Sequence, residues 1–194
     1  MIPAMRREAA REIDDVTLAR AQRGEAAACH ALVLHYQRPV FSLLGRMLFK
    51  SGRAAMVEDL AQETFLRAFR ALPAFVASGP ARLSTWILTI ATRLALDELR
   101  RRGPEAASPI SDGLADGLAA PTDGAADPVL EKTLARAIGG LSPEHRAVVL
   151  LREIHELDHE EIARVLEVDV GTVKSRLSRA RAHLRGALGE IHHG

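Results

Sequence analysis

The sequence contains little cysteine, few aromatic residues and no long uncharged apolar run. Its single cysteine, Cys29, excludes an internal disulfide and any cysteine-rich zinc module. The flanking residues are apolar and typical of a helix, which favours a packed thiol over a reactive one. The longest apolar stretch, 83–96, includes Arg93 and several hydroxyl groups, and it is too short to span a bilayer. These shortages exclude a disulfide scaffold and a membrane span.

The amino terminus also lacks an apolar core. Residues 1–15 carry charges from the sixth position onward, so no signal peptide is expected. Of the 194 residues, 47% are hydrophobic, 26% are charged and 4% are aromatic, and the formal net charge is +1. This composition is typical of a globular chain with room for one or two small domains. We therefore expect a cytoplasmic protein without direct membrane insertion.

Strand signals are nearly absent, whereas helical periodicity covers most of the chain. It extends from 14 to 102, with expected breaks at Gly24, near Pro39, at 50–52 and at 73–80, which gives four or five helices. Residues 103–128 are rich in Gly, Pro, Ala and Asp, and they cannot bury enough apolar surface to order themselves. The helical pattern resumes at 129. The sequence predicts an all-α fold with two small helical domains, 14–102 and 129–190, joined by a flexible linker at 103–128.

The second domain carries the pattern of a helix-turn-helix unit. Asp158 and Glu161 form a capping box that predicts a helix start at His159. Residues 167–170 interrupt the apolar face, and Gly171-Thr172 then open a second helix. The inward face of this unit is expected to comprise Ile162, Ala163, Val165, Leu166, Val173, Leu177 and Ala180. Small residues at a close crossing suit two helices joined by a tight turn.

The outward side of the second helix is strongly basic. It carries Lys174, Ser175, Arg176, Ser178, Arg179, Arg181 and Arg185, and the segment 164–185 contains only Glu167 and Asp169 as acids. A solvated basic face is the usual explanation of such a run. Its position on the second helix of a turn-containing pair favours contact with DNA instead. The hydroxyl groups of Thr172 and Ser175 could then reach phosphates or base edges.

Two helices of the first domain carry further chemistry. In the first, 57–69, an apolar stripe is bordered by acidic and amide side chains, which could simply be a solvated face. The second, 84–102, has a core stripe that includes Trp86, and it ends in the triplet Arg100, Arg101 and Arg102. Basic residues there also suit the dipole at a helix end. Neither helix is specific by itself.

The order of these elements resembles that of the extracytoplasmic-function sigma factors of bacterial RNA polymerase, over about 14–102 and 129–188. Other matching positions are Ala21, Gly24, Ala28, Ala31, Leu32, Tyr36, Leu141, Ser142, Pro143, Leu150, Arg152 and Glu153. The resemblance implies a non-enzymatic initiation factor without a cofactor. Its implied partners are core RNA polymerase, promoter DNA and an anti-sigma factor.

The resemblance also implies roles for single residues. Glu58, Asp59, Gln62 and Glu63 would dock on basic clamp helices of the polymerase. The loop 73–84 and the following helix would open the minus-ten element, with its strand held by Arg93, Arg100, Arg101 and Arg102. In the second domain, base edges of the minus-thirty-five element would be contacted by Lys174, Ser175, Ser178 and Arg179, with Thr172 beside them, and phosphates by Arg176 and Arg181.

The chain also departs from the family pattern. The family commonly has Asn at the position of Arg93, Gly at those of Glu156 and Glu167, and Phe at that of Cys29. Trp86 could stack on a base, but its place in the apolar stripe favours core packing. The loop 74–83 has few aromatic residues, so the sequence does not identify the residue that captures an unstacked base.

Two other functions fit parts of the sequence. Residues 155–159 spell H-E-x-x-H, a zinc-protease motif that needs both histidines on one face of one helix. The capping pair instead predicts that a new helix begins between them. The second alternative is a helix-turn-helix regulator with a helical sensing or dimerisation domain. Such a regulator would not need the acidic helix at 57–69 or the helix that ends in three arginines.

Overall fold

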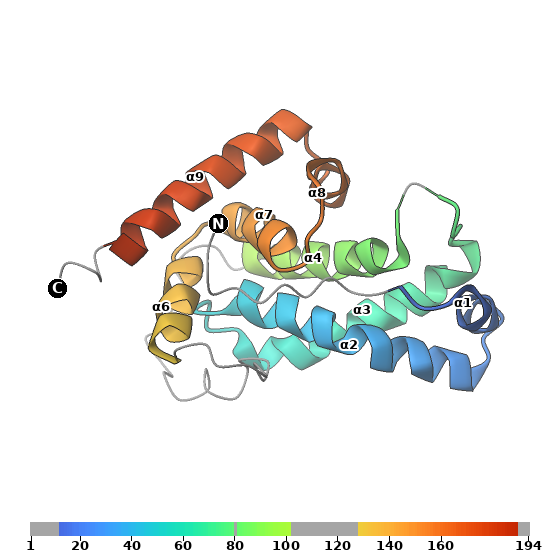
Figure 1. Cartoon of the computed structure of the whole chain (residues 1–194). Helices are drawn as coiled ribbons and strands as arrows, with labels where there is room; N and C mark the ends of the chain where they lie inside the picture. Colours follow the sequence, from blue (N-terminus) through green and yellow to red (C-terminus); the bar gives the residue numbers. More distant parts are fainter. Residues whose placement is uncertain (1–11, 80, 102–127, 190–194) are drawn as a thin grey trace.

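The computed structural model describes residues 12–79, 81–101 and 128–189, which form helices joined by short turns (Figure 1). No strand occurs within these ranges. The helices group into a first half, before the undescribed segment, and a second half after it. The predicted all-α fold is therefore confirmed.

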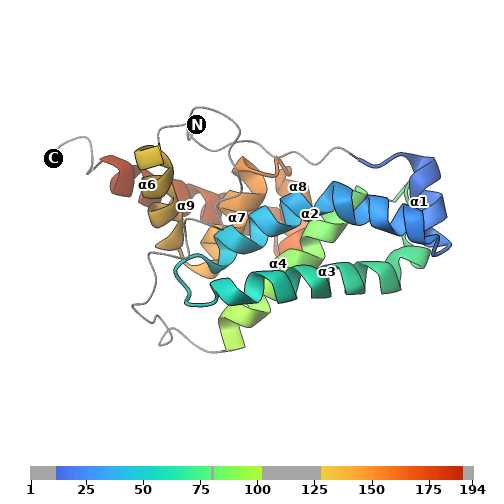
Figure 2. The same ribbon diagram turned by 90° about the horizontal axis from the view of Figure 1, so that it is seen from below.

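The first half is built around one long central helix. It contains α1 (Asp15–Gln22), α2 (Ala26–Leu48), α3 (Val57–Ala71) and α4 (Leu83–Arg101), with 3-10 turns at Ala54–Met56 and Leu72–Ala74. Figure 2 shows α2 and α3 lying side by side with α4 crossing them. Helix α2 contacts α1, α3 and α4, and its side chains at Leu32, Val40, Leu43 and Leu44 are fully buried. Burial of each such side chain contributes about 1.5–3 kcal/mol.

The predicted helix break near Pro39 is wrong, because α2 continues through that residue. A proline in a helix interior lacks one hydrogen bond and costs about 3 kcal/mol. The neighbouring side chains Tyr36, Val40 and Leu43 are buried on both sides of it. Packing of that whole helix face outweighs the local cost.

The other expected breaks are confirmed. Gly24 separates α1 from α2 with φ 77°, a left-handed conformation that glycine adopts readily. The turn after α2 has φ 58° at Lys50 and φ 70° at Gly52. Helix α3 ends at Ala71, just before the expected break at 73–80.

The second half contains four helices, α6 (Pro128–Gly139), α7 (Pro143–Glu153), α8 (His159–Leu166) and α9 (Val170–Gly189). Helix α9 packs on α6, α7 and α8, and it lies along the outer edge of the molecule (Figure 1). Residues 103–127 of the predicted linker lie outside the described residues. Its last predicted residue, Pro128, is instead the first residue of α6.

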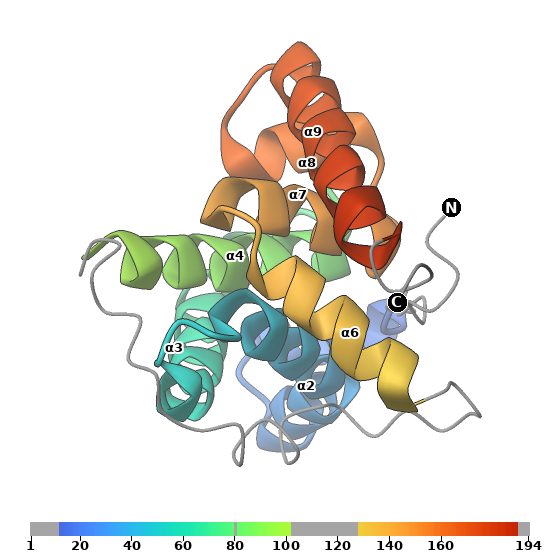
Figure 3. The same ribbon diagram turned by 90° about the vertical axis from the view of Figure 1, so that its left-hand side faces the viewer.

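The two halves pack directly against each other. Figure 3 shows α7 and α8 over α4, with α6 alongside α2, and these pairs of helices are in contact. At one junction the ends of α2 and α6 approach closely, since a Cβ added at Gly139 would lie 2.9 Å from the Phe49 ring. The chain therefore folds its two halves onto each other, an arrangement that sequence patterns do not address.

Candidate nucleic-acid interface

Helix α8, a tight turn and α9 form the predicted helix-turn-helix unit. The capping box is present: the backbone N–H of Glu161 donates to Asp158 Oδ1 at 2.7 Å, and that of Asp158 donates to Glu161 Oε2 at 2.9 Å. Helix α8 ends at Leu166, and the chain turns sharply at the following residue, Glu167, whose φ is 54°. Helix α9 begins at Val170, so the turn is one residue shorter than predicted. Val173, Leu177 and Ala180 face inward and are buried, as expected.

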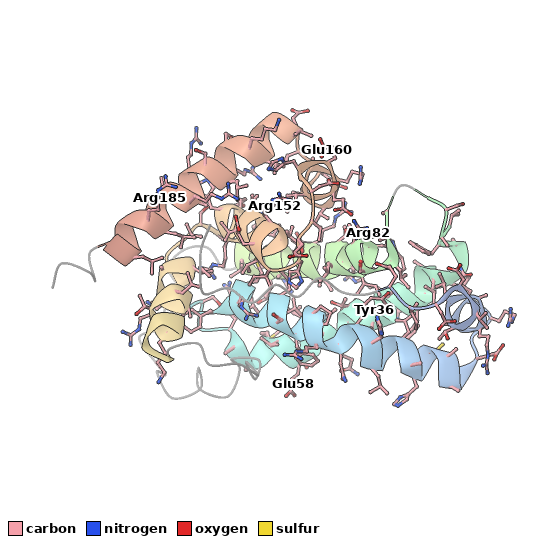
Figure 4. All side chains as sticks on the ribbon, in the orientation of Figure 1. Tyr36, Glu58, Arg82, Arg152, Glu160 and Arg185 are labelled. Carbon is pink, nitrogen blue, oxygen red and sulfur yellow. The ribbon has the colours of Figure 1, made fainter. Side chains whose placement is uncertain are left out.

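The outward face of α9 is basic and open. The side chains of Lys174, Ser175, Ser178 and Arg179 are exposed, whereas Thr172 and Arg176 are partly covered. The Ser175 hydroxyl donates to the Thr172 carbonyl at 3.0 Å. Arg185 is exposed farther along the same helix (Figure 4). A helix that presents cations and hydroxyl groups near its amino end has the chemistry that major-groove recognition requires.

Arg181 has a different environment from the other cations of α9. Its Nη2 lies 2.5 Å from Glu153 Oε1 on α7, and its Nε donates to the same oxygen at 3.0 Å. This ion pair neutralises its charge within the second half. The predicted phosphate contact of Arg181 therefore requires that a DNA phosphate competes with Glu153.

The predicted polymerase-docking residues share the outer face of α3. The apolar stripe of this helix is buried as expected, at Val57, Leu60, Ala61, Thr64, Phe65 and Ala68. Glu58, Asp59 and Gln62 are exposed, and Figure 4 shows Glu58 on the side of the molecule opposite α8 and α9. Glu63 is partly exposed and pairs with Arg67 at 2.6 Å. Helix α3 thus presents an accessible acidic face in which one carboxylate has an internal partner.

The arginines predicted to hold a promoter strand are divided among several partners. Arg93 Nη2 lies 2.9 Å from Glu167 Oε1, and its Nε donates to the Val165 carbonyl at 3.3 Å. Arg100 pairs with Glu144 of α7 at 3.3 Å, while Arg101 pairs with Glu98 at 3.5 Å. Arg102 lies outside the described residues. Arg93 and Arg100 therefore both contact the second half.

Phe75, in the segment between α3 and α4, and Trp86 of α4 form an aromatic pair that the sequence patterns do not predict. The rings of Phe75 and Trp86 lie 5.2 Å apart between centroids, and both side chains are half-buried against the core. Gln22 of α1 holds the start of the segment, since its Nε2 donates to the carbonyls of Leu72 at 3.2 Å and Phe75 at 2.7 Å. Sequence patterns do not reveal this pair, because Phe75 lies in the loop and Trp86 lies in the helix that follows it. Trp86 thus packs against the core, the arrangement that its place in the apolar stripe favoured.

The H-E-x-x-H stretch does not form one helix. Helix α7 ends at Glu153, and α8 begins at His159, so His155 lies in the connection between them. His155 is buried whereas His159 is half-exposed. Over the described ranges no group of three or more His, Cys, Asp or Glu residues is placed to hold a metal ion. The motif therefore lacks the geometry of a zinc protease.

Comparisons with known proteins match both halves of the chain. A family model for sigma-70 region 2 matches residues 32–105, and one for sigma-70 region 4 matches residues 131–184. The ECF RNA polymerase sigma factor SigW of Bacillus subtilis is 33% identical over 181 residues, which cover 88% of this chain and 94% of SigW. The ECF RNA polymerase sigma-E factor of Escherichia coli K12 is 35% identical over 178 residues, covering 87% and 90% of the two chains.

The chain belongs to the ECF RNA polymerase sigma factors. It is a transcription-initiation factor that works with RNA polymerase at promoters. The match of region 2 to the first half favours a sigma factor over the alternative of a regulator with a helical sensing or dimerisation domain.

Solved structures share the fold of this chain. The structure of CnrH in complex with the cytosolic domain of CnrY has a TM-score of 0.65 and 25% identity, covering 90% of this chain and 96% of that one. The Bartonella quintana sigma factor RpoE, solved with the anti-sigma factor NepR, shares the fold with a TM-score of 0.60, at 24% identity and with 82% and 96% coverage. In this chain, none of the described helices is both long and apolar enough to cross a membrane.

Proposed function

We propose that this sigma factor holds promoter DNA at two points while it docks on core polymerase through α3. The acidic face at Glu58, Asp59, Gln62 and Glu63 binds basic helices of the polymerase clamp. Complementary charge steers such an encounter and fixes its register more than it adds affinity. In this proposal the domain 14–102 carries polymerase docking and minus-ten recognition, and the domain 129–190 carries minus-thirty-five recognition.

The single observation that supports this proposal most strongly is the separation of two exposed charged surfaces. Helix α3 carries its acidic face on one side of the molecule, whereas the basic residues of α9 are exposed along the opposite edge (Figure 4). A protein surface and a DNA duplex can therefore be bound at the same time. Lys174, Ser175, Ser178 and Arg179 contact base edges, with Thr172 beside them, while Arg176 and Arg181 contact phosphates.

The minus-ten element is opened by the first half. Arg93, Arg100, Arg101 and Arg102 hold the separated strand through its phosphates, as single-strand binding grooves do. The binding energy drives melting, so the protein needs no cofactor or nucleotide hydrolysis and is not an enzyme. It acts in the cytoplasm, where an anti-sigma factor restrains it. The complexes of CnrH with CnrY and of RpoE with NepR support that last expectation.

The docking surface is tested by charge reversal on α3. Asp59→Arg combined with Glu63→Arg should weaken binding to core polymerase at least tenfold, because like charges across an interface cost several kcal/mol. Arg70→Glu is a useful comparison, since Arg70 is an exposed charged residue on the same helix. Binding is measured by competition with a labelled sigma factor for core polymerase. Undiminished binding of the double variant would remove α3 as the docking surface.

A further inference from the structure

The contact between α4 and α8 joins the helix proposed to hold the minus-ten strand to the helix-turn-helix unit. At one end of α8, the Thr85 hydroxyl donates to Glu161 Oε1 at 3.1 Å, and Arg82 Nε lies 3.8 Å from the same oxygen. Figure 4 shows Arg82 at the start of α4, beneath α8. Thr85 and Glu161 are both buried at this contact. The face of α4 toward the helix-turn-helix is therefore covered.

Arg93 contacts the opposite end of α8. It donates to the Val165 carbonyl at 3.3 Å and, more weakly, to the Arg164 carbonyl at 3.5 Å. These are carbonyls of the last helical turn, where a cation also meets the negative end of the helix dipole. The carboxylate of Glu167 completes the contact at 2.9 Å. All three partners come from the second half.

Glu167 adopts an unfavourable backbone conformation at this contact. Its φ of 54° and ψ of 49° are left-handed, a region that is costly for residues other than glycine. Its side chain is 73% exposed and gains little from packing. A strained residue persists when surrounding interactions compensate for it. Here the ion pair with Arg93 is an interaction that glycine at this position could not make.

We propose that Arg93 and Glu167 form a releasable latch that acts together with the buried contacts between the halves to keep the free sigma factor closed and its minus-ten surface occluded. Arg93 cannot bind α8 and a promoter strand at the same time, so closure and strand binding exclude each other. The exposed cations of α9 stay available in the closed form. The second half would therefore meet duplex DNA first, and the minus-ten strand would open the latch. The strand-binding step rests on the proposed function, whereas the closure itself does not.

The latch is tested by counting closed and open molecules with single-molecule fluorescence energy transfer. The dyes are attached to cysteines introduced by Leu34→Cys on α2 and Ala182→Cys on α9, both exposed positions, in a Cys29→Ser background. Glu167→Gly removes the carboxylate and also relieves the backbone strain. The open-to-closed ratio should rise about 1.5- to 5-fold, the range expected for a partly exposed ion pair.

Glu156→Gly is the matched control. Glu156 also has a left-handed backbone, with φ 57°, but it lies in the turn between α7 and α8. Both variants relieve a left-handed backbone, and Glu167→Gly should raise the open-to-closed ratio because it also removes the carboxylate that pairs with Arg93. The charge swap Arg93→Glu with Glu167→Lys should restore closure relative to either single reversal. An open-to-closed ratio that is the same in Glu167→Gly and wild type, or a wild-type protein that is already open, would overturn the latch.

The ligand step uses a mixed-sequence single-stranded DNA of about 12 nucleotides as the probe. Added to wild type, it should increase the open population, and Glu167→Gly should bind it tighter by the same factor that it opens the molecule. If Glu167→Gly opened the molecule without binding the single-stranded DNA more tightly, the proposal that closure masks Arg93 would be overturned. If Glu167→Gly opened the molecule but the protein bound neither this DNA nor core polymerase, the proposed function would be contradicted. The role of Arg93 and Glu167 in closing the molecule would still be supported.

Discussion

Replacing Arg146 by alanine should destabilise the protein more than any change on its surface. Arg146 is 6% exposed, and its guanidinium donates to four carbonyls from both halves of the chain. Those of Met47 and Phe49, at 2.5 Å and 3.1 Å, belong to the end of α2, and those of Gly139 and Leu141, at 2.6 Å and 3.1 Å, flank the turn between α6 and α7. Burial lowers the pKa of Arg146 to about 10, so the side chain stays charged at neutral pH.

The size of the effect follows from these contacts. A hydrogen bond to a charged group contributes about 1.5–3 kcal/mol, and the four bonds are not additive because water can reach part of the site once the side chain is removed. We expect Arg146→Ala to lower the free energy of unfolding by about 3–4 kcal/mol, the loss typical of a broken buried charge network. At 2–4 °C per kcal/mol, the melting temperature should fall by about 6–16 °C.

Thermal unfolding followed by circular dichroism measures this loss. Arg146→Lys should fall between wild type and Arg146→Ala, because an ammonium group has three donors and lacks the planar fork of arginine. Arg136→Ala removes an exposed arginine from α6 and should change stability by no more than about 0.5 kcal/mol. If Arg146→Ala melted within about 2 °C of wild type, the reasoning that this guanidinium joins the halves would be refuted.

Three further outcomes test other parts of the structure. Lys174→Ala should cost about 1–3 kcal/mol in binding of the promoter duplex and relax specificity at one position, which a panel of mutated duplexes would reveal. Arg181→Ala should reduce the slope of the logarithm of the DNA-binding constant against the logarithm of salt concentration by about 1, whereas Glu153→Gln should not reduce it. An unchanged slope for Arg181→Ala would exclude a phosphate contact. Burial, followed by the nearby Glu12 carboxylate, raises the pKa of Tyr36, so the neutral phenol stabilises the fold below pH ~10 and this stabilisation is lost as the pH rises further. Tyr36→Phe should therefore have a free energy of unfolding about 1 kcal/mol below that of wild type at pH 7, and a lower melting temperature. This difference in free energy between the two proteins should become smaller above pH ~10. A difference that stays constant with pH would contradict the stabilising role of the neutral Tyr36 phenol.

Local signals in the sequence predicted the elements that local interactions determine. The Asp158–Glu161 pair predicted the start of α8 because a capping box depends on residues only three positions apart. The apolar stripe of α3 predicted its buried face for the same reason. The break predicted near Pro39 is wrong, because the packing that compensates for this proline comes from helices distant in the sequence.

The cross-half contacts had no local signal. The sequence predicts the capping role of Glu161, but its other carboxylate oxygen accepts a hydrogen bond from Thr85, which is far away in the chain. In the sequence, Arg93 and Glu167 are separate departures from the family pattern, and only the three-dimensional structure pairs them. The roles of the exposed residues of α3 and α9 remain predictions, because they depend on partners outside this chain.

Promoter-directed transcription with reconstituted polymerase tests the central claim most directly. Core polymerase with this sigma factor should give discrete run-off products from a subset of fragments in a genomic promoter library, and the same core polymerase without it should give none of them. The products should be lost with Asp59→Arg plus Glu63→Arg, and Lys174→Ala should change which fragments are transcribed. The same products with and without the sigma factor, or identical products from both variants and wild type, would contradict a two-point promoter grip.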